Sequence, residues 1–87
     1  MIEEMLGKRV VVDLRGTFVA LGKLARVDEH FLELKSADFH DLRDTEATRE
    51  NYVAECVATG VKRNRKKVLL FREDVVAVSL FEDIVDG

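Results

Sequence analysis

A dense run of basic residues is the clearest chemical signal in this sequence. Five cations fall within the six positions 62–67, although the chain as a whole has a formal net charge of −3. Lysine and arginine neutralise phosphate groups, so the run is a candidate contact for a nucleic-acid backbone. No aromatic side chain interrupts it, so it offers charge without base stacking. Its residues are Lys62, Arg63, Arg65, Lys66 and Lys67. The alternative is a solvated loop neutralised by Glu46, Glu50 and Glu55.

Catalytic and metal-binding patterns are not suggested by the remaining reactive residues. With two histidines and one cysteine, the chain suggests no triad of a nucleophile, a base and an orienting group. His40, Asp41 and Asp44 are close in sequence, but their spacing fits no established metal site. Cys56 has no partner for a disulfide, and no glycine-rich phosphate loop is present. We therefore expect no enzyme activity, no metal and no cofactor.

Short apolar segments predict a mainly β chain, which we interpret as one domain over 1–87. Residues 2–6 have the spacing of a short helix closed by a glycine, and 9–14 alternate as a strand. Both faces of the next strand, 18–27, are largely apolar, and Gly22 within it indicates a sharp bend or bulge. The polar turn 28–30 leads to a third strand that fades by Asp38. The final strands are 68–71 and 75–80.

The segment 39–67 departs from this strand pattern and is interpreted as a long insertion. A helix is favoured within it over a strand, with Asp44 or Thr45 as N-cap and Gly60 as the residue after its last turn. Two aromatic rings among the charges of 38–44 are expected to lock the insertion to the barrel or to an adjacent subunit. Five short, strongly bent strands in so small a chain favour a barrel.

Two stretches of the chain resemble the signatures of the Sm and Sm-like (LSm) family. In the first, Leu14, Gly22, Leu24 and Asp28 reproduce the family's spacing of a leucine, a bend glycine, a second leucine and an aspartate. Residues 68–78 resemble the family's second signature. Arg72 matches the arginine of that signature, and Glu73 replaces its glycine. The resemblance implies a small, strongly bent five-stranded Sm-like (SH3-like) barrel with a short N-terminal helix.

The resemblance also implies an assembly. Members of the family form rings of six to eight subunits, in which the fourth strand of one subunit pairs with the fifth strand of the next. Such pairing removes exposed hydrogen-bonding groups from both edges. The insertion between the third and fourth strands would project from one face of that ring. The expected partner is therefore the chain itself, in a homo-oligomer.

RNA-binding members of the family hold one base in a pocket, and the equivalent positions here are His30, Leu32 and Arg72. Imidazole and guanidinium groups both stack on bases, but Leu32, at the usual asparagine position, cannot read a base edge. The alternative is an exposed turn histidine and a structural arginine paired with Asp28 or Glu73. Asp28 is expected to accept backbone N–H bonds within the turn.

Two functions remain open on this basis. The first is a ring that binds single-stranded RNA through phosphate-dominated contacts. The second is a homo-oligomeric scaffold for protein interactions with no nucleic-acid role, which the net acidity and the missing asparagine favour. The acidic start of the chain and the shortness of its apolar runs argue against a secretory signal and a membrane span, so a cytoplasmic location is expected.

Overall fold

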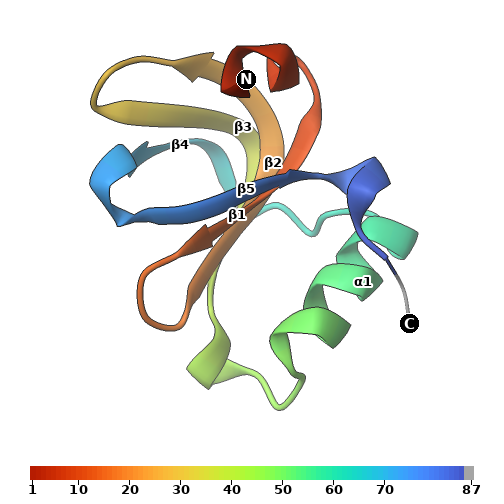
Figure 1. Cartoon of the computed structure of the whole chain (residues 1–87). Coiled ribbons are helices and arrows are strands. Elements are labelled where there is room, and N and C mark those ends of the chain that lie inside the picture. Colours follow the sequence, from red (N-terminus) through yellow and green to blue (C-terminus); the bar gives the residue numbers. More distant parts are fainter. Residues whose placement is uncertain (86–87) are drawn as a thin grey trace.

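Five antiparallel strands and one helix make up the computed structural model, which describes residues 1–85 (Figure 1). The strands form a single sheet in the spatial order β4-β3-β2-β1-β5. Short 3₁₀ turns stand at the start of the chain and at Leu42–Asp44, Arg72–Asp74 and Phe81–Asp83. The bounds are β1 (Arg9–Leu14), β2 (Phe18–Val27), β3 (Phe31–Asp41), α1 (Arg49–Thr59), β4 (Arg65–Phe71) and β5 (Val75–Leu80). No helix within the described residues is long and apolar enough to cross a membrane.

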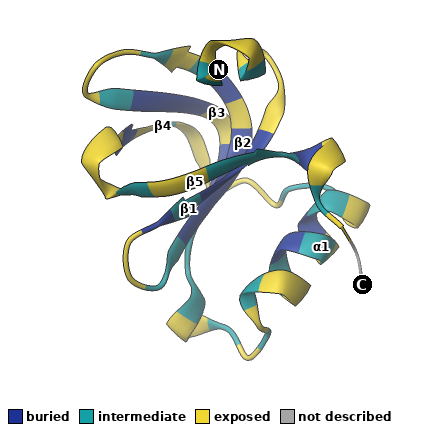
Figure 2. Cartoon of the chain, viewed as in Figure 1, coloured by how far each residue is buried: buried dark blue, intermediate teal, exposed yellow. Residues whose placement is uncertain are grey.

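Apolar residues on both faces of β1 and β2 produce two hydrophobic clusters. Alternate side chains of β1 enter the inner cluster, which the bent sheet encloses. Val11 points to the opposite face, where α1 packs against the sheet. Figure 2 shows the buried positions mainly on β1, β2 and β3, whereas α1 is mostly intermediate or exposed with a short buried stretch. The buried residues of the inner cluster are Val10, Val12, Leu14, Ala20, Leu24, Leu32, Leu34, Ala37 and Leu70. Those of the outer cluster are Val11, Val19, Leu21, Val53, Cys56 and Phe81.

The sheet is strongly bent, but the predicted barrel does not close. β4 pairs with β3 and β5 pairs with β1, and no ladder joins β4 to β5 within the described chain. Both strands are therefore edges, with one row of backbone groups left outside the sheet. The five-stranded antiparallel sheet and the helix between β3 and β4 confirm the predicted fold class.

Gly22 lies where the backbone of β3 closely approaches β2. The register of these strands shifts between Leu21 and Lys23, which marks an irregularity at the glycine. A methyl group at position 22 would lie 3.0 Å from the Cα of Ala37 and 3.0 Å from the carbonyl oxygen of Lys35. Both are backbone atoms, so they move only if the strand moves. Glycine is therefore required by the close approach of a neighbouring strand.

Substituting Gly22 with alanine is expected to destabilise the fold without unfolding it. The added methyl group forces β3 outward, and overpacking of this kind costs about 1–3 kcal/mol. Chemical denaturation monitored by circular dichroism would measure the change in the free energy of unfolding. Gly22→Val should cost more than Gly22→Ala, because its side chain is larger. Equal stability of wild type and Gly22→Val would contradict the close approach.

β3 is longer than the sequence predicted, because it continues past Asp38 to Asp41. Ser36 adopts a positive φ of 50°, and the strand then resumes its pairing with β2. Phe39 packs on Phe18 of β2 with ring centroids 5.3 Å apart, which supports the extension. The charged residues in this stretch interrupt the apolar alternation from which a strand is predicted. β4 in turn begins at Arg65, so the connection between the two strands is shorter than the predicted insertion 39–67.

The predicted helix is present as α1, and it begins later than expected. Thr48 is its N-cap, and the Thr48 hydroxyl accepts a hydrogen bond from the N–H of Asn51 at 3.2 Å. Asp44 instead ends a separate 3₁₀ turn. Gly60 follows the last turn with φ near 100°, as predicted. In the first turn, Arg49 lies 3.1 Å from Asp13 of β1 and ties the helix to the sheet.

Candidate nucleic-acid interface

Asp28 organises the turn between β2 and β3. One oxygen of its carboxylate accepts hydrogen bonds from the N–H groups of His30, at 2.8 Å, and Phe31, at 2.7 Å. These two bonds stabilise the ionised carboxylate and lower the pKa of Asp28. The turn thereby holds His30 at the protein surface, where its side chain is exposed.

Arg72 reaches this turn from the connection between β4 and β5. Its Nη1 atom donates to the carbonyl oxygen of Asp28 at 2.6 Å, and its backbone N–H donates to the carbonyl of His30 at 2.8 Å. The alternative interpretation, a structural arginine paired with Asp28 or Glu73, holds for Asp28, and the acceptor is its backbone carbonyl rather than its carboxylate. The fold therefore brings together positions 30 and 72, which are far apart in the sequence.

His30 and Arg72 share an open groove on the surface. It is lined by Glu29, His30, Phe31, Phe71, Arg72 and Glu73. The rings of Phe31 and Phe71 lie 5.3 Å apart at one side of it. Leu32, in contrast, is fully buried in the inner cluster. The residue at the family's asparagine position thus belongs to the core and does not line this groove.

The basic run is divided between two structural contexts. Lys62 and Arg63 lie in the connection before β4, where Arg63 Nη1 is 3.4 Å from the hydroxyl of Ser36. Arg65, Lys66 and Lys67 are part of β4 itself and are exposed. The expected basic loop is therefore partly an edge strand. Within the described chain, the ion pairs do not join this run to Glu46, Glu50 or Glu55.

Asp41 and His40 contact neighbouring side chains near the start of the connection, although the Nε2 atom of His40 is buried without a hydrogen-bond partner among the described residues. Asp41 accepts from the Thr17 hydroxyl at 2.6 Å and from Arg43 Nη2 at 2.7 Å, and these bonds lower the pKa of Asp41. His40 stacks on Tyr52 of α1, with ring centroids 4.7 Å apart. This stacking fastens the helix to the sheet of its own subunit. Cys56 belongs to α1 and is buried in the outer cluster, and this burial raises the pKa of its thiol.

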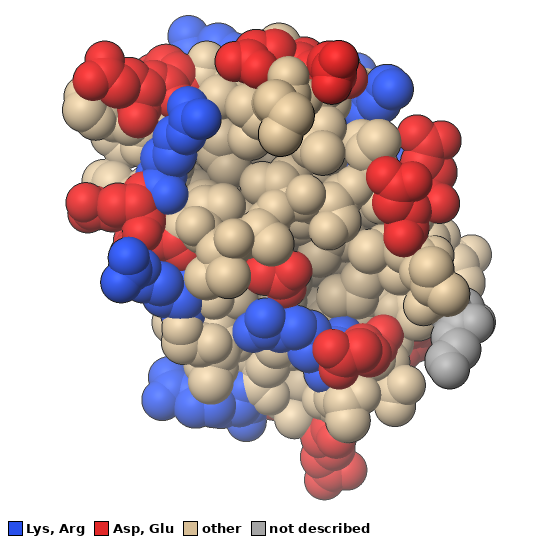
Figure 3. Space-filling view, viewed as in Figure 1, with Lys and Arg blue, Asp and Glu red and all other residues tan. Residues whose placement is uncertain are grey.

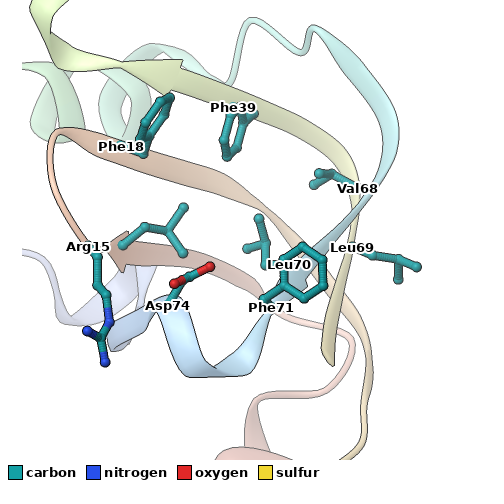
Figure 4. Close-up of a pocket in the computed structure, with 9 residues that line it drawn as sticks. Arg15, Phe18, Phe39, Val68, Leu69, Leu70, Phe71 and Asp74 are labelled. Atoms are coloured by element: carbon teal, nitrogen blue, oxygen red, sulfur yellow. The ribbon is translucent and has the colours of Figure 1, made fainter. Parts of the chain in front are cut away.

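An apolar cavity of about 420 Å³, which was not predicted from the sequence, opens between β4 and the start of β2. Figure 4 shows Phe18 and Phe39 on one side of this cavity and Leu70 and Phe71 on the other. The backbone N–H of Arg15 donates to the carbonyl of Asp74 at 2.9 Å beside the cavity. The lining residues are Leu14, Arg15, Phe18, Phe39, Val68, Leu69, Leu70, Phe71 and Asp74.

Solved structures with the same arrangement come from archaeal proteins. An Sm protein of Pyrococcus abyssii, in complex with a uridine heptamer, matches with a TM-score of 0.63 and 22% identity, over 91% of this chain and 90% of that one. An Sm-like protein of Archaeoglobus fulgidus matches with a TM-score of 0.62 and 22% identity, over 92% and 88%. A heptameric archaeal Sm protein matches with a TM-score of 0.57 and 20% identity, over 91% and 93%.

Sequence comparison gives no corresponding match. No family model matches the chain, and no curated protein matches it. The likeness is therefore one of structure at low sequence identity, and it extends over nine-tenths of the chain. It agrees with the resemblance drawn from the two signatures. The chain has the Sm-like fold.

Proposed function

We propose that this protein assembles into a closed homo-oligomeric ring that binds single-stranded RNA mainly through its phosphate groups. The observation that carries the proposal is the pair of unpartnered edge strands at opposite ends of one sheet. In a ring, β4 of each subunit pairs with β5 of the next, so no strand edge remains unpaired. A ring of six to eight subunits is consistent with the solved heptameric protein of the same fold.

Exposed apolar side chains on β4 and β5 support the proposal that these two edge strands form the contact between subunits. On β4, Leu69 is 48% exposed and Phe71 is 56% exposed, and on β5 Val76 is 68% exposed. Figure 3 shows mostly uncharged atoms over the upper part of the face that β5 crosses, with an acidic side chain near the middle and most charges toward the rim. The cavity beside β4 offers space for a side chain of the adjacent subunit. Burial of these groups would supply the driving force for assembly.

The groove of His30 and Arg72 is the proposed contact for an RNA base. Imidazole stacks on bases, and guanidinium both stacks and donates hydrogen bonds. A ring would repeat the groove once per subunit, and this repetition strengthens individually weak contacts. Because Leu32 is buried, the groove has no amide to read a base edge, and we expect little preference for uridine. The Pyrococcus abyssii protein with its uridine heptamer supports the RNA ligand class.

Binding of short fluorescent oligouridine and oligoadenine strands tests this proposal. Both should bind with similar affinity, and Arg72→Ala should weaken both about tenfold, the scale of one lost stacking contact. Arg43→Ala is the matched control, because Arg43 is exposed and its charge is already paired with Asp41. Anisotropy measured at several salt concentrations provides the affinities. Thermal melting of each variant checks that the turn of Asp28 stays folded.

The competing scaffold function makes a different prediction. A ring that only recruits proteins would persist in native mass spectrometry and show no RNA binding even at low salt. The buried Leu32 and the net charge of −3 favour this second candidate. A strong preference for oligouridine would contradict both functions as stated here, because it requires a base-reading group.

A further inference from the structure

Strand register aligns four cations across four neighbouring strands. Arg9 of β1 lies opposite Lys23 of β2, and Lys23 lies opposite Lys35 of β3. Lys35 in turn lies opposite Lys67 of β4. Residues directly opposite in an antiparallel pair present their side chains on the same face. The four residues therefore form one line across the sheet, which we name the cation row.

The cation row lies on the outer face of the sheet. Arg9 and Lys23 share the parity of Val11 and Leu21, which face α1. All four side chains of the row are exposed, so α1 does not cover them. The Arg9 guanidinium lies over the Phe81 ring, 5.2 Å from its centroid, and this contact holds one end of the row. Of these four residues, only Lys67 was a candidate RNA-binding residue on the basis of the sequence.

Acidic partners do not neutralise the row within the described chain. Its residues appear in none of the ion pairs of residues 1–85. Glu33, the next outward residue along β3, is buried and faces Arg26 at 3.6 Å. Glu82 lines a surface groove together with Arg9. Like charges placed directly opposite each other destabilise a sheet, so the row carries a cost that an anionic partner would offset.

We propose that the cation row binds the phosphate backbone of a nucleic-acid strand at a second site, separate from the His30–Arg72 groove. Adjacent strands are about 4.8 Å apart, so the row spans roughly 14 Å. That length matches about four nucleotides of a stacked strand at about 3.4 Å each. Arg63, held near Ser36, extends the positive surface next to Lys35.

This site differs chemically from the groove that the proposed function uses. The row contains no exposed aromatic ring and no acceptor, so it contacts phosphates without distinguishing bases. It rests on the proposed RNA binding, and in a ring every subunit would contribute one row. A long strand could then contact several subunits along the outer face, and the repeated contacts would reinforce one another.

The double variant Lys23→Gln, Lys35→Gln tests the row. Both residues lie on interior strands, so the edges proposed for assembly are untouched. The probe is a 20-nucleotide oligoadenine, with its affinity measured by anisotropy across a salt series. Loss of two phosphate contacts should weaken binding about tenfold or more and reduce the salt slope by about 1.4, which is 0.7 for each contact. The same variant should melt at a higher temperature, because it relieves repulsion between opposite lysines.

The double variant Arg26→Gln, Arg43→Gln is the matched control. It removes the same formal charge from two exposed residues whose charges are already paired. Its affinity and salt slope should stay close to those of the wild type. Retained affinity in the Lys23, Lys35 variant would overturn the row while leaving the groove and ring intact. Weakened binding there with no effect of Arg72→Ala would support the row and reject the groove. A wild-type ring that binds no RNA would reject both sites.

Discussion

Val76→Asp is expected to convert the assembled protein into a 9.9 kDa monomer in native mass spectrometry. Val76 is 68% exposed on the edge strand β5, so the folded subunit loses little when it is replaced. In the proposed ring the same side chain is buried against the adjacent subunit. An aspartate there places an unpaired charge in the contact, at a cost of several kcal/mol. Because each ring contains one such cost per subunit, we expect complete dissociation at micromolar concentration.

Val85→Asp is the control for that result. It introduces the same charge at an exposed valine that lies after β5 and outside the sheet. The ring should therefore persist in this variant. Leu69→Asp, on the opposite edge β4, should dissociate the ring as Val76→Asp does. A ring that survives both edge variants would show that subunits meet elsewhere, and a monomeric wild type would refute the ring itself.

Phe81→Ala is expected to cost about 3–5 kcal/mol of unfolding free energy, a large fraction of the stability of a domain this small. Phe81 is 7% exposed and belongs to the outer cluster with Val53 of α1 and Val11 of β1. It also supports the Arg9 guanidinium. Its removal leaves a cavity between the helix and the sheet, and denaturation midpoints would measure the loss.

Val85→Ala serves as the comparison for Phe81→Ala. It truncates an apolar side chain only a few residues away, but that side chain is 89% exposed. Its effect should stay within about 0.5 kcal/mol, as for other surface substitutions. A small effect of Phe81→Ala, below about 1 kcal/mol, would mean that the outer cluster does not hold α1 against the sheet.

Apolar alternation was sufficient to predict most of the sheet. β1 and β2 begin and end at the predicted residues, because each is a mainly apolar segment between glycine or polar turns. β5 was likewise visible as an isolated valine-rich segment. Gly22 was identified as an irregularity, although only the coordinates show that a neighbouring backbone lies 3.0 Å from where its Cβ would be.

Features that depend on pairing between distant strands were not predictable. Phe39 is stabilised in β3 by its contact with Phe18, which local charge patterns do not reveal. Leu32 was compared with a base-reading residue, yet strand parity places it in the core. The cation row unites residues from four strands, and knowledge of every register is needed to see it. Whether His30, Arg72 and the basic run contact RNA remains a prediction.

The apolar character of both faces of β1 and β2 has a consequence for folding. In most sheets a slip of one residue exposes the core and is rejected at once. Here Val10 and Val11 would exchange one apolar environment for another, so the penalty for such a slip comes from the charged positions Arg9, Asp13 and Lys23, which would turn toward the inner cluster. Gly22 adds a second constraint on alignment, because only a residue without a Cβ leaves room for the backbone of Ala37. Gly22 therefore favours the native register between β2 and β3 during folding.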